Sequence, residues 1–251
     1  MLTFGSLFSG IGGFDLGFER AGWACKWQVE INPYCRRVLW KHWPDVPKWN
    51  DVRTFPPDIN NGWDADCIIG GDPCQANSAA VGGGVSRNES LGGEFLRIVG
   101  AIRPRLVVRE NPTHSRKDAP WPWWRFRAGL ESLGYAVLPF RLRACCFGAF
   151  HQRDRMFLLA ERTDTNGERL AGREAKTESR ITSEPPRRIH ASDWLAISAS
   201  RGLRSRIGFP AYVERVKGIG NAVHPAVAEW IGRRILDKKL PQVRWHGVYS
   251  R

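Results

Sequence analysis

The feature that most constrains the fold is a short apolar run that stops abruptly. Cys67-Ile68-Ile69 leads into two glycines, and Pro73 and Cys74 follow within a few residues. An apolar run closed by Gly and Pro is typical of a buried strand. We therefore expect Cys74 at the carboxyl end of a strand, where open α/β sheets bind their ligands.

Cys74 itself allows two interpretations. Free cysteine is among the most buried residue types, so a structural thiol is the ordinary one. The flanking Gly-Gly-x-Pro sequence favours the other, because a strained turn suits a nucleophile presented on a rigid loop.

The rest of the chain alternates strand-like and helix-like segments. Strands are expected at 2–8, 24–30, 67–70, 106–108, 135–142 and 156–160. Helices are expected at 14–21, 33–42, 91–102, 121–133 and 218–236. This alternation predicts an α/β fold with a doubly wound, mostly parallel sheet.

The composition changes near residue 161. Residues 162–193 are rich in charge and turn residues and poor in large apolar side chains. We expect one domain at 1–160, completed by a C-terminal helix at 218–240, and a small inserted region at 161–217.

A glycine-rich segment, Ser9-Gly10-Ile11-Gly12-Gly13, follows the first expected strand, and Glu30 ends the second. Glycine lets a ligand approach the backbone. An acid about twenty residues beyond such a loop commonly holds the ribose of a nucleoside cofactor. The alternatives are an ordinary turn and a solvated carboxylate, and the combination favours the ribose role.

The charge is strongly basic. The chain has 38 Lys and Arg against 25 Asp and Glu, a net charge of +13 and a pI near 10. This balance suggests a polyanionic partner, most simply nucleic acid, although a generally basic surface is the alternative. Six cysteines without CxxC or His/Cys zinc spacing predict no metal and a reducing, cytoplasmic setting. No signal peptide or membrane span is expected.

Five motifs occur in a characteristic order: Phe8-Ser9-Gly10-Ile11-Gly12-Gly13-Phe14-Asp15, Pro73-Cys74-Gln75, Glu110-Asn111, Gln152-Arg153-Asp154-Arg155 and Gly220-Asn221-Ala222-Val223. Together they resemble the DNA (cytosine-5)-methyltransferases, over residues 4–236. The resemblance implies a Rossmann-like S-adenosylmethionine-dependent methyltransferase fold. It makes residues 161–217 a short target-recognition region, as in a compact bacterial or phage-type enzyme.

The resemblance also assigns catalytic roles. Cys74 would be the nucleophile, and Glu110 would contact the ring nitrogen and amino group of the flipped cytosine. Arg155 would help to hold that base, and Arg153 would lie near the backbone phosphates.

The cofactor, S-adenosylmethionine, would lie against the glycine loop, with Phe8 and Ile31 against the adenine. Glu30 would bind the ribose, Asp51 would take the adenine amino group, and Asn221 would close the pocket. The complete implied cofactor set is Phe8, Ser9, Gly10, Gly12, Gly13, Glu30, Ile31, Asp51, Val52, Gly71, Pro73, Asn221 and Ala222.

These residue types suit the implied reaction. Carbon 5 of cytosine is a weak nucleophile until a thiolate adds at carbon 6, and cysteine provides that thiolate near neutral pH. The base must leave the duplex, and a basic cleft grips the phosphates. The expected partner is double-stranded DNA, bound by a monomer, with a cognate restriction endonuclease as a possible companion.

Four residues depart from the family pattern: Asp72, Asn77, Pro112 and His151. A carboxylate beside a thiol raises the thiol pKa, so Asp72 would work against attack. Two alternatives stay open, namely the same chemistry on transfer RNA and a catalytically silent DNA-binding relative. A nicotinamide enzyme is a weaker third, because the third glycine of the dinucleotide pattern is missing.

Overall fold

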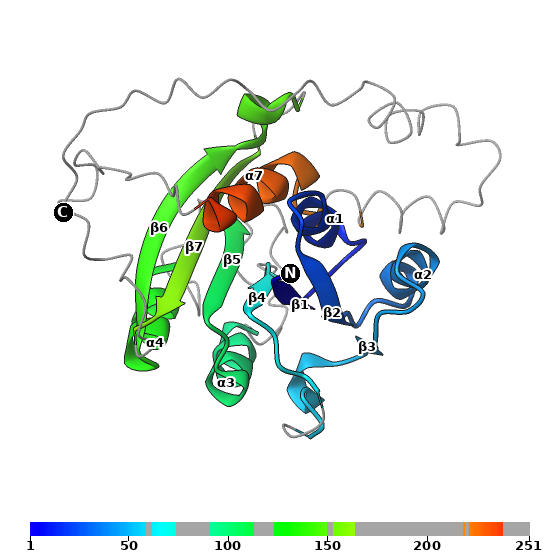
Figure 1. Cartoon of the computed structure of the whole chain (residues 1–251), viewed down its shortest axis with the longest axis horizontal. Helices are drawn as coiled ribbons and strands as arrows, with labels where there is room; N and C mark the ends of the chain where they lie inside the picture. The colour runs from blue at the N-terminus through cyan, green and yellow to red at the C-terminus, as the bar shows by residue number, and fades with distance from the viewer. Residues whose placement is uncertain are drawn as a thin grey trace, which may run out of the picture.

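The computed structural model describes residues 1–58, 62–73, 91–112, 123–149, 153–163, 218 and 221–237. These residues form one seven-stranded sheet and the helices that cover it (Figure 1). The strands are β1 (Thr3–Leu7), β2 (Ala24–Val29), β3 (Lys48–Trp49), β4 (Cys67–Gly70), β5 (Leu106–Pro112), β6 (Tyr135–Arg143) and β7 (Asp154–Arg162). The expected mixed α/β fold with a mostly parallel sheet is therefore confirmed.

The strand order is β3-β2-β1-β4-β5-β7-β6. The first five strands pair in parallel, and β7 runs antiparallel to both β5 and β6. The chain first builds outward from β1 to β3 and then returns to the other side of β1 with β4. This reversal between β1 and β4 is the point at which open α/β sheets bind ligands.

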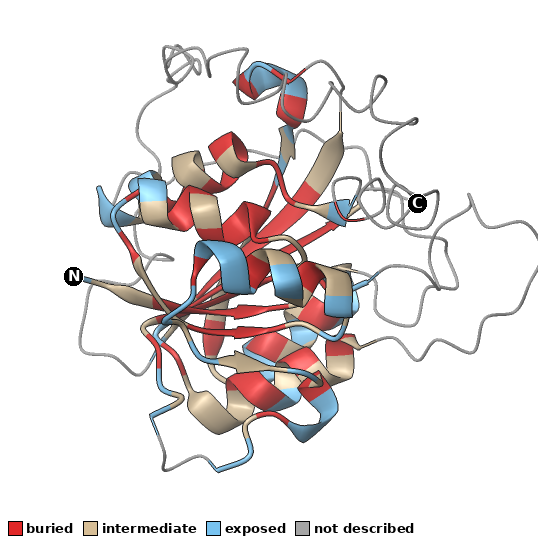
Figure 2. Ribbon diagram, turned by 90° about the vertical axis from the view of Figure 1, so that its right-hand side faces the viewer, coloured by how far each residue is buried: buried red, intermediate tan, exposed pale blue. Residues whose placement is uncertain are grey.

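Helices cover both faces of the sheet. On one face lie α1 (Gly13–Arg20) and α7 (Pro225–Leu236), and on the other lie α3 (Gly92–Ile102) and α4 (Trp123–Ser132). Buried residues concentrate in the strands between these two layers (Figure 2). Helix α2 (Pro33–His42) follows β2, and two short 3₁₀ helices, η1 (Val52–Thr54) and η2 (Ala144–Phe147), complete the described elements.

Helices α1 and α7 pack at close range because α1 presents glycine to its partner. A Cβ at Gly13 would lie 2.3 Å from the Val223 carbonyl oxygen, and one at Gly17 would lie 2.4 Å from the Ala228 Cβ. Side chains at these positions would hold the helices apart. The close contact brings the C-terminal segment against the start of α1.

The helix starts follow local signals. Asn32 caps α2 by accepting hydrogen bonds from the Tyr34 and Cys35 amides at 2.8 and 3.2 Å, and Pro33 occupies the first helical turn. The expected start at residue 33 is correct. The last helix was expected to open at Gly218. Gly218 and Asn221 are helical, and the Ala222 amide donates to the Gly218 carbonyl at 3.1 Å, but α7 itself begins at Pro225, where proline again occupies the first turn.

Strand β3 was not expected from the sequence, since two residues carry no readable periodicity. Residues 164–217 and 238–251, which include most of the expected region 161–217, lie outside the described residues.

Candidate functional site

The predicted site residues follow directly after one row of paired residues across the sheet. Leu7 pairs with Val29 on one side and with Gly70 on the other, and the row continues to Trp49 and Arg109. The next residues along the chain are Phe8, Glu30, Gly71 and Glu110, and Asp51 lies two residues after Trp49, the last residue of β3. Strand pairing therefore gathers groups that are more than one hundred residues apart along one edge of the sheet, the edge formed by the carboxyl ends of its parallel strands.

The glycine loop turns sharply at this edge. Phe8, Gly10 and Gly12 have φ values of 54°, 57° and 85°, the left-handed region that glycine adopts without strain. The Ser9 amide donates to the Val29 carbonyl at 3.1 Å, and the Ser9 hydroxyl donates to the Ser6 carbonyl at 3.1 Å. These bonds hold the loop against the ends of β1 and β2.

Glu30 connects the glycine loop to the start of α2. Its carboxylate accepts hydrogen bonds from the Gly10 amide and from the Asn32 amide, each at 2.7 Å. Burial raises the pKa of Glu30, and the two amides oppose that shift. The two bonds fix the Glu30 carboxylate between the glycine loop and the start of α2.

The residues expected to contact adenine lie near Glu30. Ile31 is an exposed large apolar side chain, with 61% of its surface accessible. The Phe8 ring lies 6.2 Å from the Phe95 ring of α3, so α3 supports it from behind. An exposed isoleucine and a supported aromatic ring are suitable walls for a flat apolar ligand.

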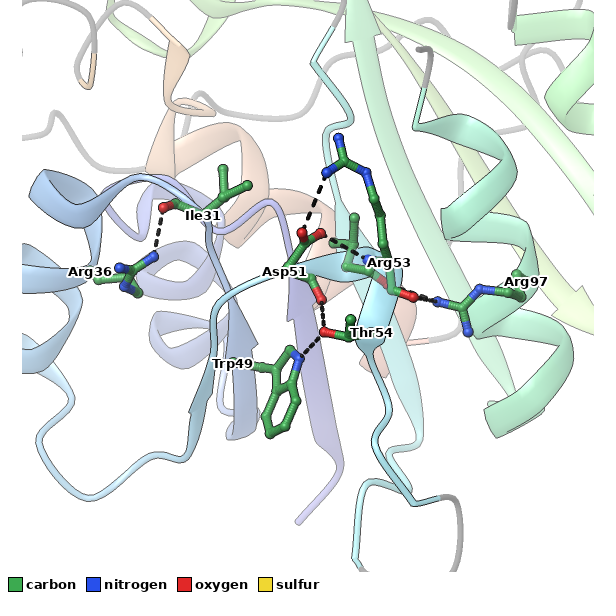
Figure 3. A network of polar contacts seen from close by, with 8 residues as sticks. Ile31, Arg36, Trp49, Asp51, Arg53, Thr54 and Arg97 are labelled. Atoms are coloured by element: carbon green, nitrogen blue, oxygen red, sulfur yellow. Dashed lines mark hydrogen bonds and ion pairs between the residues drawn. The ribbon is translucent and has the colours of Figure 1, made fainter. Parts of the chain in front are cut away.

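The η1 segment is held by a polar network (Figure 3). Asp51 caps η1 by accepting from the Arg53 amide at 3.0 Å, and its carboxylate pairs with the Arg53 guanidinium at 3.4 Å. Arg97 of α3 donates to the carbonyls of Val52 and Phe55, each at 2.7 Å. An arginine from α3 therefore holds the backbone beside Asp51 and Val52 in place.

The C-terminal segment lies against the glycine loop and the start of α1. A Cβ at Gly13 would lie 3.2 Å from the Ala222 Cβ, and one at Gly218 would lie 3.0 Å from the Ile11 side chain. Asn221 is exposed and lies one residue before Ala222. The close packing of Gly13 against Val223 requires glycine at this position whether or not a ligand binds.

Glu110 occupies the centre of the second group of residues. Its carboxylate is buried and pairs with the Arg155 guanidinium at 2.8 Å. Burial raises the Glu110 pKa, while Arg155 and Arg153 lower it. A Cβ at Gly71 would lie 2.9 Å from the Glu110 Oε2 atom, so this glycine leaves room for the carboxyl group.

A small pocket lies beside this pair. Its lining combines charged groups with apolar side chains: Glu110, Leu142, Ala144, Arg153, Arg155, Phe157, Val223, His224 and Val227. Sequence reasoning missed buried His224, which follows the Asn221-Ala222-Val223 motif directly. Its position directly after that motif is the sequence signal that could have identified it.

Cys74 lies outside the described residues, whose nearest member is the exposed Pro73. Asp72, by contrast, is buried and forms a two-bonded ion pair with Arg109. The sequence expectation that the Asp72 carboxylate works against attack by Cys74 did not include Arg109, whose positive charge offsets that carboxylate.

Among the described residues, no group of three or more His, Cys, Asp or Glu side chains is arranged to hold a metal ion. None of the helices described is both long and apolar enough to cross a membrane.

The strand order defines a Rossmann-like fold of the S-adenosylmethionine-dependent methyltransferase type. The chain belongs to the C-5 cytosine-specific DNA methylase family, whose model matches residues 2–200. The resemblance drawn from the five motifs is thus confirmed.

Individual relatives agree with this assignment. The chain is 32% identical over 171 residues to the Type II methyltransferase M.NgoFVII of Neisseria gonorrhoeae, covering 64% of this chain and 44% of that protein. It is 33% identical over 176 residues to M1.HphI of Haemophilus parahaemolyticus, covering 64% and 46%. The chain spans about half the length of these curated relatives.

The fold also matches a solved structure described as a DNA modification methyltransferase encoded within a prophage of E. coli. The TM-score is 0.53 with 28% sequence identity, over 64% of this chain and 47% of the other.

Proposed function

We propose that this chain transfers a methyl group from S-adenosylmethionine to carbon 5 of a cytosine that is flipped out of a specific duplex DNA sequence. The observation that carries the proposal is the buried Glu110–Arg155 pair, which lies at the same sheet edge as Glu30 and the glycine loop. One edge of the sheet would therefore combine a site for the cofactor nucleoside with a buried acid for the target cytosine.

The cofactor would occupy the β1–β2 side of the edge. Glu30 would hold the ribose, and Phe8 and Ile31 would flank the adenine, with Asp51 facing its amino group. Gly71, Pro73, Asn221 and Ala222 would border the remainder of the pocket. The left-handed turn at Gly10 supports this placement, because nothing lies within 4 Å of the position that a side chain would take there except the Phe8 carbonyl oxygen, at 4.0 Å. When bound, S-adenosylmethionine supplies the methyl group.

Glu110 would act on the target base. A carboxyl group with a raised pKa retains its proton closer to neutral pH, so it can donate to the ring nitrogen of cytosine. The Cys74 thiolate would add at carbon 6 as that proton arrives, which makes carbon 5 nucleophilic. Arg155 would hold the Glu110 carboxyl group and the base, and Arg153 would lie near the phosphates.

DNA binding is supported by the net charge of +13. We propose residues 161–217 as the region that reads the target sequence, because the cofactor and catalytic residues lie outside it. A restriction-modification setting, with a cognate endonuclease and a monomeric methyltransferase, is part of the same proposal.

Methyl transfer tests the proposal directly. The chain should transfer labelled methyl groups to duplex DNA and not to total transfer RNA, and Cys74→Ala should abolish the reaction while DNA binding persists. Bisulfite sequencing of DNA from expressing cells should then place every methylated cytosine in one sequence motif. Transfer to RNA alone, or a fully active Cys74→Ala variant, would contradict the proposal.

A second experiment tests the covalent route. DNA with 5-fluorocytosine at the target should form an adduct that survives denaturing electrophoresis, because fluorine cannot leave carbon 5 as a cation. The adduct should require S-adenosylmethionine and should not form with Cys74→Ala. An enzyme that is active on ordinary DNA but forms no adduct would exclude the Cys74 route.

A further inference from the structure

Strand β5 carries polar groups to both faces of the sheet at its carboxyl end. Glu110 lies on the face of α1 and α7, where it meets Arg155. Arg109 and Asn111 alternate with Glu110 and lie on the opposite face, where the Arg109 guanidinium carbon is 4.0 Å from the centre of the Phe126 ring of α4. The Arg109 side chain therefore packs against an apolar residue of α4.

Arg109 and Asn111 converge on Asp72, which lies two residues before Cys74. Arg109 Nε and Nη2 donate to the two Asp72 carboxylate oxygens at 2.5 and 2.8 Å. The Asn111 amide donates to Asp72 Oδ1 at 3.2 Å and to the Asp72 carbonyl at 3.4 Å. Both the side chain and the backbone of Asp72 are therefore held by β5.

The Asp72–Arg109 pair is inaccessible to water, with 2% and 1% of the side-chain surfaces exposed. Moving two charges out of water costs much of what their attraction returns, so such a pair is a poor source of stability compared with apolar residues. A two-bonded Arg–carboxylate pair does define geometry, because both bonds form only in one relative orientation. Orientation is thus the property that this pair provides.

The adjacent residues make that orientation relevant to the site. Gly71, next to Asp72, faces the Glu110 carboxyl group, and Glu110 is next to Arg109. Any shift of Asp72 along β5 would therefore change the distance between Glu110 and the chain that leads to Cys74.

We propose that Arg109, assisted by Asn111, is a positioning residue that fixes Asp72 on β5 and so sets the start of the Cys74 segment relative to Glu110. The role of Cys74 in this inference rests on the proposed function. The fixing of Asp72 does not, and it can be measured separately.

The test compares four proteins: the full-length wild type, the double variant Asp72→Leu/Arg109→Met, the single variant Arg109→Lys, and the control Arg127→Met. The double variant removes both buried charges together and replaces them with apolar side chains, so it should fold. Arg109→Lys keeps the positive charge but cannot form the two parallel hydrogen bonds to the Asp72 carboxylate. Arg127 forms an exposed pair with Glu131 on α4, outside the proposed site.

Two measurements are made on each protein. Hydrogen exchange with mass spectrometry follows the peptide that covers residues 70–76, with α4 and β7 peptides as internal references. The rate of adduct formation on 5-fluorocytosine DNA is followed at saturating DNA and S-adenosylmethionine, and the affinities for both ligands are measured separately.

We expect faster exchange in peptide 70–76 of the double variant, unchanged reference peptides and unchanged ligand affinities. Adduct formation should slow by roughly 10- to 100-fold, since a displacement of about 1 Å can cost about that much. Arg109→Lys should fall between the double variant and the wild type, and Arg127→Met should match the wild type.

Unchanged exchange in peptide 70–76 overturns the proposal, as does a double variant that forms adducts at the wild-type rate. If the wild type forms no adduct, the proposed function fails, and the exchange data still decide whether Arg109 fixes Asp72. If both variants lose ligand affinity together with the adduct, a general structural role replaces the positioning role.

Discussion

The Glu30 carboxylate accepts a hydrogen bond from the Gly10 amide at 2.7 Å, across twenty residues of chain. This bond joins the ends of β1 and β2 at the point where we propose the nucleoside site. The other oxygen of the Glu30 carboxylate accepts a hydrogen bond from the Asn32 amide at the start of α2. Glu30 thus connects the glycine loop to the start of α2.

We predict that Glu30→Ala weakens S-adenosylmethionine binding by about tenfold or more. A hydrogen bond to a charged group contributes about 1.5–3 kcal/mol, and the variant loses the ribose contact as well as the bond to Gly10. Titration calorimetry measures the affinity, and Glu131→Ala, an exposed helix carboxylate, serves as the control. DNA affinity should be unchanged, and an unchanged cofactor affinity would refute the ribose role.

We predict that Glu110→Gln slows methyl transfer by roughly 100-fold or more, in the range expected for a lost acid. Glutamine preserves the shape of the side chain but has no acidic proton to give to the ring nitrogen. Single-turnover rates with labelled cofactor provide the measurement, and DNA and cofactor affinities should stay within about twofold of the wild type. A near-normal rate would exclude proton donation by Glu110.

We predict that Arg97→Met lowers cofactor affinity by about two- to tenfold, since ordering a loop costs about 0.5–1.5 kcal/mol for each side chain involved. Arg97 holds the Val52 and Phe55 carbonyls, and so it keeps Asp51 in place without touching the proposed adenine position. Calorimetry again gives the affinity. The exposed-helix variant Arg127→Met should bind like the wild type, and equal affinities in both variants would show that Arg97 is dispensable.

We predict that Gly17→Ala destabilises the fold by about 1–3 kcal/mol, the usual cost of overpacking. The new Cβ would lie 2.4 Å from the Ala228 Cβ of α7. The matched control is Gly100→Ala in α3, where the nearest atom is 3.4 Å away, so the gain in helix propensity should stabilise by about 0.5–1 kcal/mol. Urea unfolding compares the two, and equal effects would mean that α1 and α7 separate at little cost.

We predict a pH-dependent contribution to stability from Asp15. It is fully buried, where it accepts hydrogen bonds from Ser6 and Gln28, and burial raises its pKa from 3.8 to about 6. The folded state therefore holds the Asp15 proton more tightly than the unfolded state does. The stabilisation is complete below pH 3.8 and is lost as the pH rises through 6.

The measurement is urea unfolding of the wild type and Asp15→Asn at several pH values. The free energy of unfolding of the wild type, relative to Asp15→Asn, should increase by about 2–3 kcal/mol between pH 7 and pH 4. A difference that stays constant with pH would mean that Asp15 has an ordinary pKa.

Several elements could be predicted from local sequence because their signals lie within a few residues. Cys67–Gly70 is bounded by its own glycine, and α2 begins at Pro33 after its Asn32 cap. The five motifs identified the family for the same reason, since each is a continuous stretch. Strand β3 could not be predicted, because it exists only through its pairing with β2.

The sequence by itself determined the order of the longer strands and helices, the family and the residue types expected at the site. Only the tertiary structure decided which of those residues meet. Asp72 and Arg109 are 37 residues apart, and no local pattern marks them as a pair. Their contact depends on the parallel register that sets Gly70 beside Arg109. Register is a property of the whole sheet, so it cannot be read from a local stretch of sequence. In the folded chain, the charge of the Asp72 carboxylate is balanced by Arg109.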